Sequence, residues 1–495
     1  MPSRPAPTVP PRGGVRALWL LLTAASVLSC VSGNNVETDA GGSTSGGTGG
    51  AGTASLGGHT GTGGALGVGG ATATDAAVDA GRDATGTGTG GARVDASGDR
   101  GTTDAPTDAS LTLGPAVFGK NLRINDDTGT GNQSEVTMAA GPGGLVLTGW
   151  MDSRSTRVCA FSSSTDGGLT WSKNVSIPNN TGMFVGDPAV AIDGGGTMYA
   201  VCQEYLNVGV TGNIRMMSST DHGATWSAIQ TIQSAPDKPW AGGGTTDGTL
   251  FVSWLGNAAG IKRSLDHGAT WGPIQPLGNI IHGTGITASQ SGLLHVPYNL
   301  DSARNQLRYV RSKDNGGTYD APRDIVADMG TFCFTCSPRQ HPIVGSSADP
   351  TGRTVAITWS STMPGGQGDD DVWLLYSKDG GDTWTQPIRV NDNPTASRQF
   401  QAWVAVDAHG RVHVAWTDLR DNGQNETFYA RSADPTKGFE PNQQVTDGRG
   451  SAMTDFLGDY KGIVVQGPDV LVVWQDTRRD SGDIYFSRAA GAAGP

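Results

Sequence analysis

The chain has 495 residues, of which 76 are glycine and 26 are proline, and only 16% are charged. Apart from Trp19, all of its 13 Trp, 9 Tyr and 11 Phe residues lie between Phe118 and Phe486. A packed core can form only in that part, because the preceding stretch has too little apolar surface to offset chain ordering. The net charge of −12 excludes an electrostatic role on nucleic acid or on an anionic membrane surface.

Residues 1–30 have the pattern of a secretion signal. Three arginines precede an apolar run over residues 17–28, which is too short for a permanent transmembrane helix. The run ends in Val-Leu-Ser-Cys30, which resembles the lipobox of bacterial lipoproteins, where lipid is attached to the cysteine. We expect a signal peptide with lipidation at Cys30, and the alternative is an ordinary signal peptide in which Cys30 is incidental.

Residues 31–113 are rich in Gly, Thr and Ala, and this composition predicts a disordered linker. The segment up to Leu113 has no aromatic, Ile, Met, Cys or Lys residue. A coil of this length spans roughly 50 Å, enough to hold a folded domain away from a membrane. We therefore expect an exported protein, either lipid-anchored at the cell surface (outer membrane) or secreted, with no other membrane contact.

One short motif, S-x-D-x-G-x-T-W, recurs through residues 114–495. Five copies begin at Ser164, Ser219, Ser264, Ser312 and Ser377, with Tyr in place of Trp in the fourth, and a decayed copy begins at Ser432. They resemble the Asp boxes (BNR repeats) of the sialidase, or neuraminidase, superfamily. The Asp carboxylate suits turn N–H groups and the Gly suits a left-handed backbone, so we interpret each box as structural.

A second repeat precedes each box and predicts an all-β fold. It consists of a short strand, a Gly/Asp turn and an apolar strand that often ends in Trp. Seven copies begin at Glu135, Asp187, Asp237, His282, His341, Gln401 and Asp459. Units of four antiparallel strands predict a β-propeller, here with seven blades. Six blades, the number in the sialidases that the motif resembles, is the alternative.

The seventh unit lacks a box and a fourth strand. The segment 120–126, KNLRIND, matches the fourth-strand segment 387–392, PIRVND, of another unit. We therefore predict that the strand near Leu122 completes the last blade and closes the ring, which removes both free sheet edges.

Four cysteines follow Cys30, an even number in a protein expected to be exported. Cys333 and Cys336 are close enough to pair locally, and Cys159 and Cys202 lie on predicted strands of adjacent blades. We expect disulfides. A metal site at Cys333, Cys336 and His341 has only three candidate ligands, so we predict no metal and no cofactor.

The starts of the inner strands and the loops between second and third strands share one face, which holds the substrate in sialidases. That face carries Glu135, Lys238, His282, His341 and Tyr460, and three W-x-D-x-R loops. The resemblance implies Asp152 as general acid, with Tyr460 and Glu135 as nucleophile and base, and the loop residues Arg154, Arg420 and Arg478 as carboxylate ligands.

The sequence also departs from the sialidase pattern. The arginine motif F/Y-R-I-P is missing from the first inner strand, and each D-x-R loop has the alternative interpretation of an internal ion pair that braces the loop. Lys238, His282 and His341 are candidate ligand-binding residues, and the two histidines are alternatively acid/base groups of a lyase or ordinary channel-lining residues.

The combined pattern predicts an exported, monomeric, sialidase-like propeller that binds or processes extracellular glycans. If it is an enzyme, a sialidase-like exo-glycosidase or a polysaccharide lyase is expected. The alternatives are a propeller that binds a surface protein or a scaffold propeller without catalysis, because fold resemblance does not fix function.

Overall fold

The computed structural model describes residues 113–494 apart from short gaps (155–156, 181–182, 207–211, 236, 301–304, 334–335, 364–365, 367–368, 395 and 452–455). The expected signal peptide, Cys30 and the linker to residue 112 lie outside the described residues. Within the described part, no helix has the length and hydropathy required to cross a bilayer.

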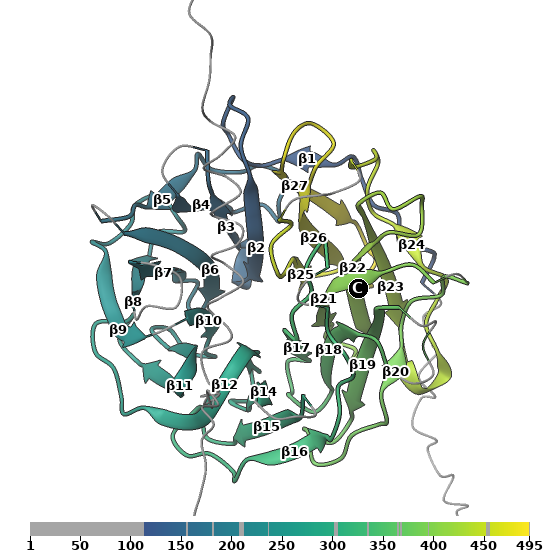
Figure 1. Cartoon of the computed structure of the whole chain (residues 1–495). Coiled ribbons are helices and arrows are strands. Elements are labelled where there is room, and N and C mark those ends of the chain that lie inside the picture. The colour runs from purple at the N-terminus through teal and green to yellow at the C-terminus, as the bar shows by residue number, and fades with distance from the viewer. Residues whose placement is uncertain are drawn as a thin grey trace, which may run out of the picture. The chain divides into compact units, whose positions relative to one another are not determined.

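Seven four-stranded antiparallel blades surround a common axis (Figure 1), so the predicted all-β propeller and its blade number are confirmed. Blade 1 consists of β2 (Gln133–Ala140), β3 (Val146–Asp152), β4 (Val158–Ser164) and β5 (Val175–Ile177). Blade 2 consists of β6 (Phe184–Ile192), β7 (Met198–Tyr205), β8 (Gly212–Ser219) and β9 (Gln230–Ala235). Blade 5 has β17 (Gly345–Ala348), β18 (Val355–Ser361), β19 (Asp371–Ser377) and β20 (Ile388–Arg389), and blade 6 has β21 (Gln399–Val406), β22 (Val412–Asp418), β23 (Glu426–Ser432) and β24 (Gln443–Gln444).

Blades 3 and 4 are continuous with each other. Blade 3 comprises β10 (Asp237–Gly243), the long β11 (Leu250–Ser264) and β12 (Gln275–Thr284). Blade 4 comprises β13 (Thr287–Ala288), β14 (Leu294–Leu300), β15 (Leu307–Ser312) and β16 (Arg323–Val326). The end of β12 pairs with β14, so the outer strand of blade 3 runs directly into the inner edge of blade 4.

The ring closes through its N-terminal strand, as predicted. Blade 7 contains β25 (Gly462–Gln466), β26 (Asp469–Asp476) and β27 (Asp483–Ala489), and β1 (Leu122–Arg123) pairs with β27 as its fourth strand. Leu122 lies opposite Phe486, and the Ile124 amide donates to the Ile484 carbonyl at 2.9 Å. Both chain ends of the described part are therefore fixed in one sheet.

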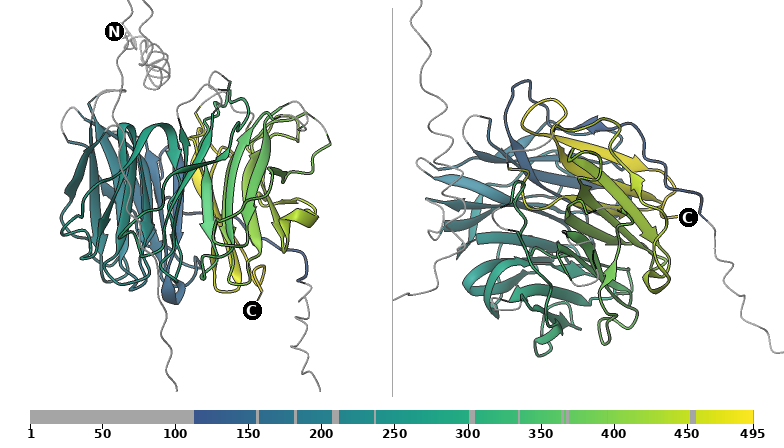
Figure 2. Two further views of the ribbon diagram at one scale, coloured as in Figure 1. Left: turned by 90° about the horizontal axis from the view of Figure 1, so that it is seen from below. Right: turned by 45° about the vertical axis from the view of Figure 1, so that its right-hand side comes forward.

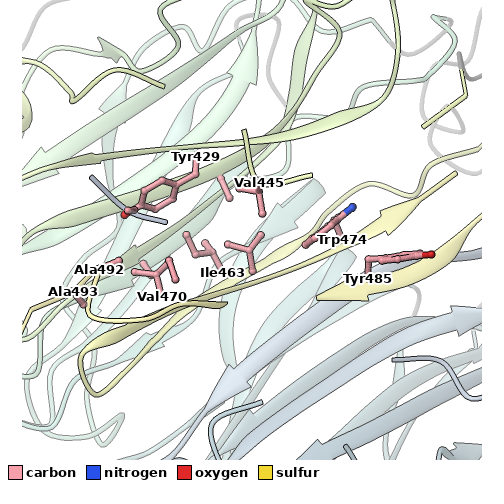
Figure 3. Packing of buried hydrophobic residues seen from close by; sticks show 13 residues of the cluster. Tyr429, Val445, Ile463, Val470, Trp474, Tyr485, Ala492 and Ala493 are labelled. Carbon is pink, nitrogen blue, oxygen red and sulfur yellow. The ribbon is translucent and has the colours of Figure 1, made fainter. Parts of the chain in front are cut away.

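The core lies between neighbouring blades rather than at the axis. Between blades 6 and 7, Tyr429, Val445, Ile463, Val470 and Trp474 pack together in one buried cluster (Figure 3). The alternating apolar residues of each strand supply these layers, since successive side chains point to opposite faces of a sheet. The strands run from one face of the ring to the other (Figure 2), so the starts of all inner strands gather on one face.

The S-x-D-x-G-x-T-W segments form hydrogen-bonded turns. In the first, Asp166 accepts from the Thr170 amide at 2.9 Å and from the Thr170 hydroxyl at 2.6 Å, and Ser164 Oγ accepts from the Gly168 amide at 2.8 Å. Trp171 then packs edge-on against Phe486 of blade 7, with ring centroids 5.1 Å apart. The Asp166 carboxylate is thus engaged in the hydrogen bonds of the turn, which is a structural role rather than a catalytic one.

The four cysteines form two disulfides in the expected pairs. Cys159 of β4 joins Cys202 of β7 and so links blades 1 and 2, while Cys333 joins Cys336 in the segment before β17. The backbone N–H of Gln340 donates a hydrogen bond to the Cys333 carbonyl of the short disulfide loop at 2.9 Å. This contact fixes the course of the chain immediately before the inner strand of blade 5.

Candidate functional site

Four inner strands begin with the same backbone distortion. Glu135, Asp187, Lys238 and Gln401 all have a left-handed φ, between 40° and 57°, although none is glycine. Each lies where the register between the first and second strands shifts by a β-bulge. A bulge redirects a side chain, and such strained residues persist where the surrounding structure holds them. The repeated bulge brings polar side chains together at the start of the inner strands.

Lys238 is the centre of an ion network at the axis. Its Nζ lies 2.9 Å from Asp187 Oδ1, 2.8 Å from Asp459 Oδ2 and 4.0 Å from Glu135 Oε1. Burial opposes the charged form, but the three carboxylates outweigh it and hold the pKa of Lys238 well above its ordinary value. One ammonium thus joins inner strands from blades 1, 2, 3 and 7.

Arg339 adds a second cation to this network. Its Nε and Nη2 atoms lie 3.0 and 2.8 Å from the two oxygens of Asp459, a bidentate pair. Burial alone would raise the pKa of Asp459, but Arg339 and Lys238 lower it well below its ordinary value. Gly458, with a φ of 77°, precedes Asp459, and a Cβ there would lie 2.5 Å from the Glu135 amide nitrogen. Only glycine allows this close approach of blades 7 and 1.

Two other acids at the axis, Glu135 and Asp237, have pKa values above their ordinary ones. Burial, and then the charge of Asp187, raises the pKa of Glu135 to about 8. The same two causes raise the pKa of Asp237, beside Lys238, to about 7. At neutral pH, Asp459 is thus the ionised partner that Lys238 and Arg339 share.

Tyr460 lies beside Glu135 but is enclosed by aromatic rings. Its ring is 4.9 Å from Trp240 and 6.3 Å from Trp403, and only 3% of the residue is exposed. Burial, and then the charge of Glu135, raises the pKa of Tyr460 well above its ordinary value. Glu135 thus acts on Tyr460 electrostatically, and solvent hardly reaches the Tyr460 ring.

A narrow pocket opens next to the network, between blades 5, 6 and 7. Its lining residues are Arg339, Gln340, His341, Ile343, Ser360, Phe400, Gln401, Ala402, Trp403 and Asp459. Its interior of about 10 Å³ is enough for one water-sized group. The pocket therefore admits a protruding group of a larger ligand rather than a whole ring.

The pocket contains buried polar atoms that the chain does not satisfy. Both ends of the Gln340 amide and the Ser360 hydroxyl are buried and have no hydrogen-bond partner among the described residues. Gln340 is 4% exposed and Ser360 is 5% exposed. Buried polar groups without partners cost about 1–3 kcal/mol each, so hydrogen bonds from a water molecule or a ligand in the pocket would stabilise these atoms.

The W-x-D-x-R loops are self-contained. In blade 7, Asp476 accepts from the Trp474 indole at 2.9 Å and binds Arg478 through Nε at 2.9 Å and Nη2 at 2.7 Å. Arg478 also contacts Asp447 at 2.5 Å, and its guanidinium lies 4.6 Å from the centroid of an aromatic ring of the same blade. Within the motif, the Asp476 carboxylate thus accepts hydrogen bonds from both Trp474 and Arg478.

In the other two loops the arginine again binds the aspartate of its own loop, but only in blade 6 does the tryptophan indole also donate to that aspartate; the Trp150 indole has no partner among the described residues. Arg420 contacts Asp418 at 2.8 Å and Asp392 at 2.9 Å. The Nε atom of Arg154 lies 2.8 Å from both oxygens of Asp152, and its Nη2 makes a further contact with Asp152. This is the geometry of the bracing alternative. Each arginine is thus held by the aspartate of its own loop, and the Asp152 carboxylate is engaged by Arg154.

Of the two predicted histidines, only His341 has a described side chain. His341 lines the pocket, and burial lowers its pKa to about 4, so its imidazole is neutral at pH 7. His282 lies in β12, and its side chain is outside the described part of the structure.

One group of residues on the opposite, turn-bearing face has the composition of a metal site. Asp193, Asp247 and His267 offer three atoms within 4.8 Å of one another. However, Asp193 already accepts from the amides of Gly195, Thr197 and Gly248 and from the Tyr199 hydroxyl, at 2.7 to 3.0 Å. Its carboxylate is thus committed to the turn.

Sequence reasoning missed Arg339, Gln340 and Ser360. Arg339 and Gln340 precede the inner strand of blade 5 by a few residues and belong to no repeat, so nothing in the repeat pattern distinguished them. The only clue was their position between the Cys333–Cys336 pair and His341, which the chain brings to the axis.

The fold and its repeated S-x-D-x-G-x-T-W turns define a seven-bladed β-propeller with a polar axial pocket. No protein-family model matches the sequence, and no curated protein matches it.

Solved structures with a similar fold include the NanB sialidase of Streptococcus pneumoniae, with 12% identity and a TM-score of 0.44 over 60% of this chain and 67% of that chain. Another is the intramolecular trans-sialidase of Ruminococcus gnavus, with 14% identity and a TM-score of 0.42 over 60% of this chain and 92% of that chain. A third is a protein of unknown function from Dyadobacter fermentans, with 14% identity and a TM-score of 0.47 over 75% of this chain and 98% of that one. The chain spans about two thirds of the length of the NanB chains, 66% in one structure. These likenesses concern the fold.

Proposed function

We propose that the protein is a glycan-binding propeller whose axial pocket receives a hydroxyl or hydroxymethyl group of a sugar. The observation that carries the proposal is the set of unsatisfied buried atoms at Gln340 and Ser360. A sugar hydroxyl both donates and accepts hydrogen bonds, so it matches an amide and a hydroxyl in one pocket. Arg339 and Asp459, at the same pocket, offer a donor and an acceptor.

The surroundings of the pocket favour a sugar over an apolar ligand. Trp403 and Phe400 line one wall, and Trp403 is only partly buried, so its ring can pack against the apolar face of a pyranose. Gln401 is held by the Leu457 and Gly458 carbonyls at 3.0 and 2.9 Å, which fixes the rim of the pocket next to Asp459. A rigid pocket with several polar groups and one aromatic wall suits a polyhydroxylated ligand.

A binding screen tests this proposal. The full chain is applied to an array of neutral, amino, uronic and sialyl oligosaccharides, together with Gln340→Leu, which keeps the side-chain size but removes the amide. Wild type should bind at least one class, and Gln340→Leu should bind it at least 10-fold more weakly. Gln233→Leu, on the outer strand β9, serves as the matched control and should bind normally. Thermal unfolding checks that each variant is folded, and Ser360→Ala provides a second pocket variant.

Two results would overturn the proposal. The first is that folded wild type binds no glycan, and the second is that Gln340→Leu and Ser360→Ala both bind as well as wild type. In either case a protein-binding or scaffold propeller becomes the better interpretation.

A hydrolase is the second candidate, favoured by the proximity of Glu135 and Tyr460. A raised Glu135 pKa suits a proton-transfer group, as in glycosidases that tune one acid upward. The enclosure of Tyr460 by Trp240 and Trp403 argues against it. Hydrolysis of sialyl and uronic-acid glycosides by wild type, lost in Tyr460→Phe, would establish this activity. No release of sugar by wild type would remove it.

We further propose that the protein is exported and held at the cell surface by lipid on Cys30. The proposal rests on the N-terminal sequence pattern and on the long linker that follows it. Incorporation of labelled palmitate into wild type, lost in Cys30→Ala, would support it, and equal labelling of both proteins would contradict it.

A further inference from the structure

We infer that the axial pocket selects uncharged sugars and excludes acidic ones. The inference rests on the proposed glycan-binding function and names the class of glycan. It is carried by the ion pairs beside the pocket, since both cations of the axial network, Lys238 and Arg339, are already bound to carboxylates of the chain.

The two cations of the axial network share the same acid. Asp459, whose side chain is 0% exposed, contacts Lys238 and occupies both Nε and Nη2 of Arg339. Lys238 is also bound to Asp187. A ligand carboxylate would have to displace Asp459 from a bidentate pair and leave a buried anion unpaired, which is a costly exchange.

A third cation near the pocket is paired in the same way. Arg398 donates to the Pro338 carbonyl at 2.8 Å and binds Asp370 at 2.8 Å. Its guanidinium lies 5.4 Å from the centroid of the Phe400 ring, and its Nη2 atom has no hydrogen-bond partner among the described residues. Asp369 adds a second carboxylate at 4.0 Å. This group therefore brings no net positive charge to the pocket.

Each arginine of the three W-x-D-x-R loops contacts two aspartates. Besides the aspartate of its own loop, Arg154 lies 3.6 Å from Asp127, and Arg420 and Arg478 each contact a second aspartate. Each of the three loop arginines is thus engaged with two carboxylates.

Among the residues that line the pocket, the buried side chains left without a hydrogen-bond partner in the described part of the chain, Gln340 and Ser360, are uncharged. The Gln340 amide and the Ser360 hydroxyl can donate and accept, but neither can compensate a full negative charge in a pocket beside Asp459. A hydroxymethyl group satisfies both without adding charge. A carboxylate of similar size would face Asp459 and, farther along the network, Glu135 and Asp187.

A matched pair of ligands tests this selectivity. Oligogalactosides and oligogalacturonides differ chiefly at C6, which is a hydroxymethyl group in one and a carboxylate in the other. Binding of both to the full chain is measured by calorimetry, together with Asp459→Asn and with Asp476→Asn as control. Asp476 is a buried aspartate that also binds Nε and Nη2 of one arginine, but in the blade 7 loop.

Wild type should bind the neutral oligomer at least 10-fold more tightly than the acidic one. Asp459→Asn, which releases Arg339 and Lys238, should reduce this ratio at least 10-fold, and Asp476→Asn should leave it unchanged. Tighter binding of the acidic oligomer by wild type overturns the inference even if Asp459→Asn does not fold. An unchanged ratio in folded Asp459→Asn also overturns it. If wild type binds neither these oligomers nor any other glycan of the array, the proposed function itself fails.

Discussion

At the residue scale, Lys238 joins strands that are far apart in the sequence. Its ammonium contacts carboxylates from blades 2 and 7 and approaches that of blade 1. Removing one partner from a buried network leaves the others uncompensated, which is more damaging than losing a surface ion pair.

Lys238→Met should therefore lower the free energy of unfolding by about 3–5 kcal/mol. Urea unfolding at pH 7 measures this loss. Lys262→Met, at a partly exposed lysine of β11, should change the stability by less than about 0.5 kcal/mol. Equal, small effects of the two substitutions would show that the network does not stabilise the ring.

Glu135 gives the ring a distinct pH dependence. Its pKa is about 8 in the folded protein and near 4.5 in an unfolded chain, so the folded state binds this proton more tightly. The associated stability is complete below pH 4.5 and is lost as the pH rises through 8. Glu135→Gln cannot lose the proton, so its stability relative to wild type should increase between pH 5 and pH 9.

Urea unfolding at several pH values measures this difference. Glu440→Gln, at a glutamate of blade 6 that binds Arg431, should lower the stability by a similar amount at each pH, so its difference from wild type should stay constant between pH 5 and pH 9. If the curves of Glu135→Gln and wild type run parallel over this range, the account of Glu135 is incorrect.

At the element scale, β1 contributes two residues of strand but completes a blade. Ile124, directly after it, is 5% exposed and packs with Val136 and Trp150 of blade 1 while its amide pairs with Ile484. Ile124→Pro removes that hydrogen bond and reopens the edge of β27.

We expect Ile124→Pro to lower the free energy of unfolding by about 3 kcal/mol or more and to increase aggregation. Val117→Pro, at a 74% exposed residue before the strand, is the control and should be nearly neutral. Urea unfolding and light scattering report the two effects. A neutral Ile124→Pro would mean that β1 is not needed for closure.

The elements were predictable because their signals are local and repeated. Alternating apolar residues, the Gly/Asp turns and the repeated box gave the seven blades, and the similarity of residues 120–126 to residues 387–392 gave the closing strand. Long-range pairing of Cys159 with Cys202 followed once the two strands were placed in adjacent blades. Because the same strand and turn motifs occur in each blade, an ambiguous residue in one copy does not change the predicted fold.

The site was only partly predictable, because it depends on positions that do not repeat. Glu135, Lys238, His341 and Tyr460 were expected on the correct face because each begins an inner strand or lies next to one. Arg339 and Gln340 come from an irregular segment whose position depends on the Cys333–Cys336 loop. The D-x-R loops have the sequence of a carboxylate site and equally that of an internal Asp–Arg ion pair, the alternative interpretation of the sequence, which the structure shows.

At the scale of the whole molecule, the ring divides its two faces by chemistry. One face carries the repeated turns, whose polar groups satisfy one another. The other carries the starts of the inner strands, where bulges bring charged groups of different blades to the axis and leave Gln340 and Ser360 without partners. The rigid ring thus holds a small polar pocket in a fixed geometry, as binding sites on propellers require.

Hydrogen exchange of the full chain with and without its best-bound oligosaccharide tests the central claim, that this pocket is the binding site. The account predicts that saturating sugar slows exchange in peptides covering residues 339–343, 400–403 and 457–461. Protection confined to the turn-bearing face, or to the loops around Arg154, Arg420 and Arg478 with no change at those three segments, would contradict it.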